Sequence, residues 1–145
     1  MTYLLVRNGI VQEHEGALDL KFMQKFVGRL GERAIIDVGY YYFMNPKIAV
    51  IFDDEFLIKG LELCCCVKRI EAQNAQVFRG NCIVAKQQRG DLIGLNESEK
   101  QEVLNELKVF KGEMKNSKKV QLKTARDFLS NEVFELDKEL LRFAK

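Results

Sequence analysis

The sequence predicts an α+β fold, in which a mainly antiparallel sheet is joined by one helix after an N-terminal hairpin and by two C-terminal helices. Three observations lead to this class. An Asn-Gly pair separates two short apolar runs within residues 3–13. Residues 34–95 are rich in β-branched and aromatic side chains, interrupted by polar turns. After Asn96 the apolar residues recur three and four positions apart, which is the period of a helix.

The N-terminal hairpin and the helix that follows it are predicted from turn and capping signals. Residues 3–6 form one expected strand, the Asn8-Gly9 pair favours a tight hairpin turn, and residues 10–13 form the returning strand. Asp19 is the expected N-cap of the helix, because apolar residues follow it at helical spacing: Phe22, Met23, Phe26, Val27 and Leu30.

Strands are expected through the centre of the chain. Residues 34–44 are β-rich, residues 48–52 have the composition of a buried strand, and residues 56–58 return after a polar turn. The type of residues 61–70, an apolar run that holds three cysteines, is ambiguous, and strand is favoured over helix.

The most informative stretch covers residues 77–99. It predicts a strand with Gly80 inside it, where a bulge or a close backbone approach is expected, then a turn and a second short strand. Asn96 is expected to cap a helix, and Glu99 stands at the position that completes a capping box.

Two apolar stripes predict the two C-terminal helices. The first consists of Val103, Leu107, Phe110 and Met114, and the second of Leu122, Ala125, Leu129, Val133, Leu136, Leu140 and Phe143. We therefore expect an α+β core domain over residues 1–107 and a helical extension over residues 108–145, packed on the core or on a partner subunit. Such a wide apolar surface predicts a homo-oligomer, most simply a dimer. Its expected interface residues are Leu129, Val133, Leu136, Leu140 and Phe143.

Composition narrows the class of protein. A hydrophobic fraction of 47% and a charged fraction of 30% are those of a globular chain, and the net charge of +2 excludes a chain that binds polyanions over its whole surface. No apolar run approaches the ~20 residues of a membrane span, and no signal-peptide core is found. We expect a cytoplasmic protein without a membrane partner, in the host cytoplasm if a phage encodes it.

The sequence offers no motif for catalysis or for a cofactor. The cysteines are expected to be reduced and buried: Cys64, Cys65, Cys66 and Cys82. Adjacent residues of a strand alternate faces, so three neighbouring thiols are not expected to converge on one metal ion. His14 is the single histidine. Three consecutive acids at 53–55 can hold Mg²⁺, but such a run is more often a solvated turn. We expect no metal, no cofactor and no catalytic residue.

Basic and aromatic residues give a candidate ligand site. Glu71 is the single acid between residues 68 and 89, and Arg side chains there offer forks that suit phosphate. In a strand over 40–43 alternation places two tyrosines on one face, where they can stack on bases. The candidates are Lys68, Arg69, Arg79, Asn81, Lys86, Arg89, Tyr40 and Tyr42. The alternative is solvated charge scattered on a sheet face, with one aromatic pair in the core.

Five motifs, in order, resemble the bacterial and phage family catalogued as domain of unknown function family 3846. They are Met23–Gly28, Ile35–Val38, Val50–Glu55, Gly80–Val84 and Gly90–Glu99. The resemblance covers roughly residues 1–107. The chain departs from the family pattern at Cys64, where an Asn is expected, and from Lys108 onward. The resemblance implies a phage, prophage or plasmid setting and no catalytic residues.

These observations favour a non-enzymatic binding protein of a phage or other mobile element. It is expected to capture a host protein or a phosphate-bearing, nucleotide-like ligand, with a role in counter-defence. One alternative is a nucleic-acid-binding accessory protein that uses residues 108–126, a segment with seven basic residues and one acidic residue. A less favoured alternative is a metal-dependent nuclease or phosphodiesterase built on Asp53 and Asp54.

Overall fold

Two sheets and two α-helices make up the part of the chain that this computed structural model describes. The described residues are 2–7, 9–16, 18–28, 34–56, 59–68, 75–111 and 121–130. In chain order the elements are β1 (Tyr3–Arg7), β2 (Ile10–His14), α1 (Leu20–Val27), β3 (Ile36–Gly39), β4 (Ile48–Asp53), β5 (Leu63–Lys68), β6 (Ala75–Arg79), β7 (Cys82–Gln88), β8 (Asp91–Ile93), α2 (Glu97–Glu106), β9 (Lys108–Lys111), β10 (Gln121–Thr124), the 3-10 helix η2 (Ala125–Phe128) and β11 (Leu129–Ser130).

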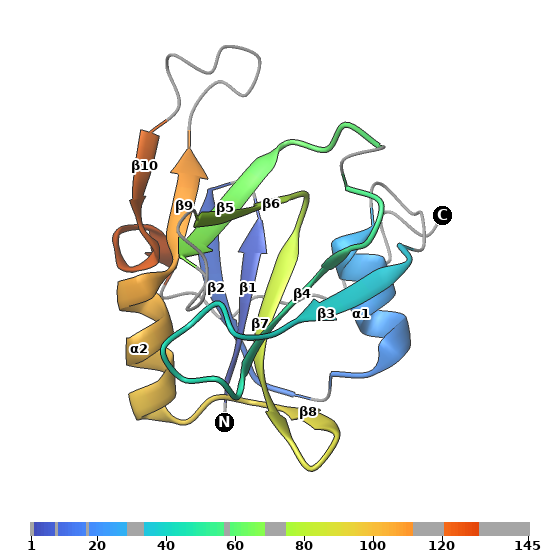
Figure 1. The fold of residues 1–145 in the computed structure, drawn as a ribbon, viewed down its shortest axis with the longest axis vertical. Coiled ribbons are helices and arrows are strands. Elements are labelled where there is room, and N and C mark those ends of the chain that lie inside the picture. The colour runs from blue at the N-terminus through green and yellow to red at the C-terminus, as the bar shows by residue number, and fades with distance from the viewer. Residues whose placement is uncertain are drawn as a thin grey trace.

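The larger sheet has seven strands in the order β11-β2-β1-β7-β4-β3, with β8 also paired to β7 (Figure 1). The smaller sheet has the order β10-β9-β5-β6. Strand pairs are antiparallel except for β11 beside β2, which is parallel. The predicted α+β class with a mainly antiparallel sheet is confirmed.

The central strands of the larger sheet are buried on both faces. Leu4 pairs with Val84 and Leu5 pairs with Ile83, and each pair shares a face because side chains alternate along a strand. Leu4 and Val84 belong to one core cluster, and Leu5 and Ile83 belong to the other. Burial on both faces explains why these strands read as continuous apolar runs rather than as an alternation.

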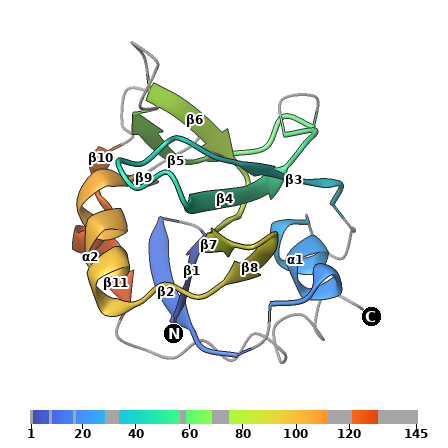
Figure 2. The same cartoon turned by 60° about the horizontal axis from the view of Figure 1, so that its bottom comes forward.

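Different elements cover the two faces. Helix α1 covers one face with the buried side chains of Met23, Phe26 and Val27. The smaller sheet and α2 close the other face, which holds the larger core cluster. Figure 2 shows β5 and β6 on the opposite side of β4 from α1. The molecule is therefore layered around the seven-stranded sheet.

The predicted turn and caps of the first half are confirmed. Arg7 pairs with Ile10 across the hairpin, and Gly9 takes the positive φ of 74° that such a turn requires. Asp19 caps α1, since its side chain accepts a hydrogen bond from the Phe22 backbone N–H at 2.7 Å. The apolar run at 61–70 contains strand β5, as favoured.

The cap of α2 is also confirmed. The Glu99 backbone N–H donates to Asn96 Oδ1 at 2.8 Å, and the Asn96 backbone N–H donates to Glu99 Oε1 at 2.9 Å. These two bonds form the predicted capping box. The helix ends at Glu106, however, and Leu107 has extended backbone angles.

The first predicted C-terminal helix exists as α2, but the helical extension predicted over residues 108–145 is wrong where the structure describes β9, β10 and β11. β9 pairs with β5, where Cys65 faces Val109, and β10 pairs with β9. The backbone of β9 pairs with the edge of β5 that β6 leaves open. Val109 is buried, and its two neighbours in the strand are less buried. Tertiary pairing thus overrides the helical spacing of the apolar residues. Residues 131–145 lie outside the described ranges.

Candidate functional site

The loop between β3 and β4 differs from its prediction. Residues 40–43 were expected to continue a strand, with Tyr40 and Tyr42 on one face, but the strand ends at Gly39. Tyr41 has a φ of 67°, which turns the chain and breaks the alternation. Consequently Tyr42 and the adjacent Phe43 are both buried, while the Tyr41 side chain is 53% exposed.

Two contacts hold this loop in place. The Tyr42 ring packs edge-on against the Phe78 ring, with 5.2 Å between centroids. A Cβ at Gly39 would overlap the same Tyr42 ring. The Met44 backbone N–H donates to Glu106 Oε1 at 2.8 Å, which ties the loop to the end of α2. The Met44 side chain nevertheless remains 76% exposed. The loop therefore presents Tyr41 and Met44 to solvent from a fixed backbone.

Three of the predicted ligand residues have partners within the chain. Arg79 donates from Nη1 to the Leu61 carbonyl at 3.2 Å, and Asn81 donates from Nδ2 to the Phe26 carbonyl at 2.8 Å. Lys86 forms an ion pair of 2.8 Å with the buried Glu99 carboxylate. These residues fasten the β6–β7 turn and the α2 cap to the rest of the fold.

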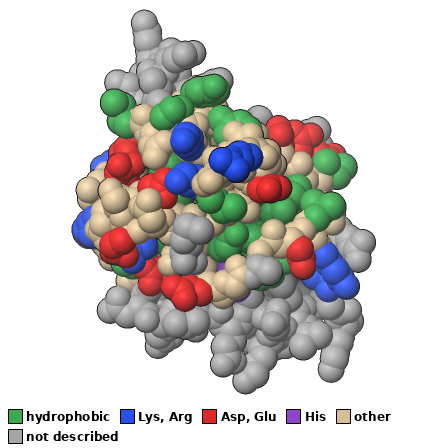
Figure 3. Space-filling view, turned by 90° about the horizontal axis from the view of Figure 1, so that it is seen from below, with side chains coloured by type: hydrophobic (Ala, Val, Ile, Leu, Met, Phe, Trp, Pro, Cys, Tyr) green, Lys and Arg blue, Asp and Glu red, His purple; other side chains and the backbone are tan. Residues whose placement is uncertain are grey.

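The remaining candidates are not gathered in one place. Arg89 is exposed in the β7–β8 turn at a φ of 53°, and Tyr40 is half-buried after β3. Asn81 and Arg89 flank opposite ends of β7, a seven-residue strand roughly 23 Å long. Lys68 lies in β5, with its side chain outside the described residues, as is the whole of Arg69. Figure 3 views the end that carries β8 and shows basic side chains interleaved with acidic and apolar ones.

The predicted interface falls mostly outside the described residues. Leu129 lies in β11 and packs against the larger core cluster of its own chain. Within the basic stretch 108–126, the guanidinium of Arg126 donates to Asn105 Oδ1 at 3.0 Å and to Gln101 Oε1 at 2.6 Å. The interface residues outside the described ranges are Val133, Leu136, Leu140 and Phe143.

Asp53 is not part of a solvated turn. Its side chain is fully buried and accepts hydrogen bonds from the Glu55 backbone N–H at 2.8 Å and from Lys59 Nζ at 2.9 Å. The neighbouring Asp54 is exposed and does not share this site. A buried carboxylate with an ammonium partner gives Asp53 a structural role.

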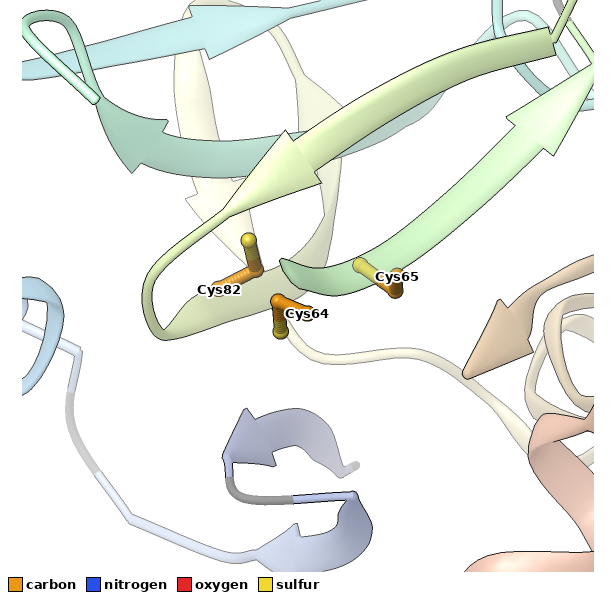
Figure 4. A group of neighbouring side chains, drawn as sticks. All are labelled: Cys64, Cys65 and Cys82. Carbon is orange, nitrogen blue, oxygen red and sulfur yellow. The ribbon is translucent and has the colours of Figure 1, made fainter. Parts of the chain in front are cut away.

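The four cysteines are buried and unbridged, as predicted. Three of them nevertheless lie close together, because the Sγ atoms of Cys64, Cys65 and Cys82 are within 4.8 Å of one another (Figure 4). The expectation that neighbouring thiols must point apart is therefore wrong for Cys64 and Cys65.

A β-bulge causes this convergence. Leu63 pairs with Arg79, but Cys65 pairs with the next residue, Phe78, so Cys64 is an extra residue in β5. A bulge bends the strand and breaks the alternation of faces. Cys82 comes from the start of β7, directly after the tight turn at Gly80, whose φ is 79°. The three thiols thus meet between two strands of different sheets.

The pKa values of the three thiols depend on one another. Hydrogen bonds from the Cys65 and Cys82 thiols lower the pKa of Cys64, against the opposing effect of burial. The hydrogen bonds to Cys64 and burial raise the pKa of Cys65 and of Cys82. One proton is therefore lost more readily than the other two, and the cluster titrates as a group.

No family model, curated protein or solved structure matches this chain in the three comparisons made. No helix in the described part of the chain is long and apolar enough to cross a membrane.

Proposed function

We propose that this chain is a non-enzymatic binding protein, which captures a partner protein through the β3–β4 loop. One observation carries the proposal. Tyr41 and Met44 are largely exposed on a loop whose backbone is held by the core and by Glu106. Aromatic residues and methionine are enriched where proteins bind each other.

The backbone angle of Tyr41 supports this role. A bulky side chain at positive φ costs on the order of 1–3 kcal/mol, and such strain clusters at functional positions. Gly fits this angle without strain, so folding alone does not explain a tyrosine there. The anchored neighbours Tyr42 and Phe43 keep the loop in one conformation, which lowers the entropy lost on binding.

The contacts of the basic candidates favour a protein over a phosphate-bearing ligand. Within the chain, the side chains of Arg79 and Asn81 already donate hydrogen bonds, and Lys86 already forms an ion pair. The candidates are also spread out, since Asn81 and Arg89 lie at opposite ends of β7. The resemblance to the phage and plasmid family supplies the proposed setting, a mobile element whose product binds a host protein in counter-defence. The nucleic-acid alternative stays a prediction.

The experiment compares matched surface variants. The full chain is immobilised, retained bacterial proteins are identified by mass spectrometry, and the affinity of a purified candidate is measured by calorimetry. Tyr41→Gly should weaken binding at least about tenfold, because an aromatic anchor is lost. Its unfolding free energy should be unchanged or higher by up to about 1 kcal/mol, because the strain is relieved. Ile35→Ser is the control, since Ile35 is a comparably exposed apolar residue elsewhere.

Two results would contradict the proposal. One is a partner whose affinity is unaffected by Tyr41→Gly and by Met44→Ser. The other is a Tyr41→Gly variant that keeps full affinity while losing stability, which would make Tyr41 a structural residue. Retention of nucleic acid with a steep loss at higher salt would favour the nucleic-acid alternative instead.

A further inference from the structure

We propose that Cys64, Cys65 and Cys82 form a binding site for one thiophilic metal ion, and that Cu(I) fits this site. The three Sγ atoms lie within 4.8 Å of one another and come from two strands. Thiolate sulfur is a soft ligand that selects Cu(I), zinc and iron–sulfur clusters over hard cations. The site is independent of the β3–β4 loop and of the partner proposed for it.

The spacing of the thiols suits three-coordinate binding. With a metal–sulfur distance of ~2.3 Å, three ligands around one ion lie about 4.0 Å apart. The observed upper limit of 4.8 Å exceeds that spacing by about 0.8 Å. Cys64 Sγ and Cys82 Sγ are each 3.6 Å from a backbone carbonyl oxygen, of Val6 and Gly80 respectively.

The number of ligands separates Cu(I) from zinc. Structural zinc is almost always tetrahedral and takes four protein ligands. Among the described residues, the converging group contains three cysteines and no histidine or carboxylate. Cu(I) accepts three sulfur ligands, so the site is complete for it and one ligand short for zinc.

Burial of the site adds a cost to metal binding, because thiolate ligands carry negative charge. Cys65 and Cys82 are fully buried and Cys64 nearly so, and an uncompensated charge there is costly. Thiolate sulfur, not the thiol, is the metal ligand, so the thiol protons leave to solvent as Cu(I) binds, and the ion offsets part of the negative charge that remains. No electron transfer is involved.

The β6–β7 turn lies next to the cluster and is partly open to solvent. Gly80 and Asn81 are partly exposed and directly precede Cys82 in the chain. A hydrogen bond from the Gly80 backbone N–H to the Glu62 carbonyl at 2.8 Å joins this turn to the residue before β5.

The test uses the full chain, reduced and kept free of oxygen, with Cu(I) supplied in competition with a chelator of known affinity. We expect one Cu(I) per chain, an X-ray absorption spectrum with sulfur neighbours at ~2.3 Å, and a rise in melting temperature with added Cu(I). Cys64→Ala should lower the affinity at least about a hundredfold. Cys66→Ala is the matched control on the same strand, because Cys66 does not belong to the converging group, and it should leave the affinity unchanged.

The absorption spectrum needs no variant, so it decides the question even if a cysteine substitution prevents folding. Oxygen or nitrogen neighbours in place of sulfur would overturn the proposal. Binding of less than half an ion per chain, or equal loss of affinity in Cys64→Ala and Cys66→Ala, would also overturn it. Stoichiometric Zn(II) binding without Cu(I) binding would overturn the assignment to Cu(I).

Discussion

The two faces of the seven-stranded sheet differ in chemistry, although the same strands build them. The face under α1 is packed with hydrocarbon and aromatic side chains, such as Leu5 and Phe26. The opposite face contains the three converging thiols and the residues that anchor the β3–β4 loop, Tyr42 and Phe43. Both proposed binding sites therefore depend on residues of the face opposite α1.

Two irregular features of the backbone lie on the face opposite α1. The bulge at Cys64 and the positive φ of Tyr41 both occur in segments that pack against the larger core cluster. Segments that cover the α1 face, by contrast, follow their local signals, as the Asp19 cap shows. Irregular geometry is not confined to that side, however, since Arg89, in the turn before β8, also has a positive φ.

The largest expected effect comes from removing the Phe78 ring, which belongs to the larger core cluster and contacts Tyr42 of the β3–β4 loop. Phe78→Ala should cost about 3–5 kcal/mol, because the fully buried Phe78 ring contacts both Tyr42 and Phe52. It should also make the loop susceptible to chymotrypsin at Tyr41 under native conditions. Denaturant unfolding and limited proteolysis measure the two effects.

Leu5→Ala is the control for that experiment, since Leu5 is equally buried but belongs to the α1 face. It should cost about 2–5 kcal/mol and leave the loop resistant in the native state. Equal loop cleavage in both variants, after correction for stability, would show that the faces are not distinct.

The two helix caps provide a smaller comparison. Asn96→Ala should destabilise the protein by about 1 kcal/mol, because it removes one member of a reciprocal capping box. Asp19→Ala removes a single bond to the Phe22 backbone and should cost no more than that. Thermal melts of both variants measure the difference, and an Asn96→Ala melt identical to the parent would contradict the cap.

The smallest expected effect is a pH dependence at Glu99. Burial raises the pKa of Glu99, but the hydrogen bond and charge of Lys86 and the Asn96 backbone bond outweigh burial, so the net pKa is lowered. A carboxyl group with a lowered pKa contributes stability above its unfolded pKa of about 4.3, and loses it as pH falls through the folded value. Glu99→Gln should therefore make the unfolding free energy less dependent on pH below about pH 4.3, as measured by thermal melts between about pH 3 and about pH 7. A profile as steep as that of the parent would contradict this assignment.

Much of the fold could be predicted from local signals. The hairpin turn at Gly9 and the capping box at Asn96 depend on a few adjacent residues, and both are confirmed. The strands β9 and β10 could not be predicted, because their apolar spacing also fits a helix and the open edge of β5 decides between the two. That edge lies more than forty residues earlier in the chain, beyond the reach of local periodicity.

The candidate sites were harder to predict than the fold. Convergence of Cys64 with Cys65 depends on a register shift against β6, which no pattern within β5 reveals. The turn glycine before Cys82 was a partial signal, because Gly80 brings the start of β7 beside β5. Exposure of Tyr41 depends on one backbone angle, whereas strand alternation had suggested a regular face.

The most direct test of the central claim compares two adjacent residues of β7, Val84 on the thiol face and Ile83 on the α1 face. Labelling rates of Cys64, Cys65 and Cys82 are measured by mass spectrometry in native Val84→Ala and Ile83→Val, each normalised to its own unfolding free energy. If the faces are distinct, Val84→Ala accelerates labelling of the three thiols and Ile83→Val does not. Equal acceleration in both variants, or none in Val84→Ala, would contradict the account.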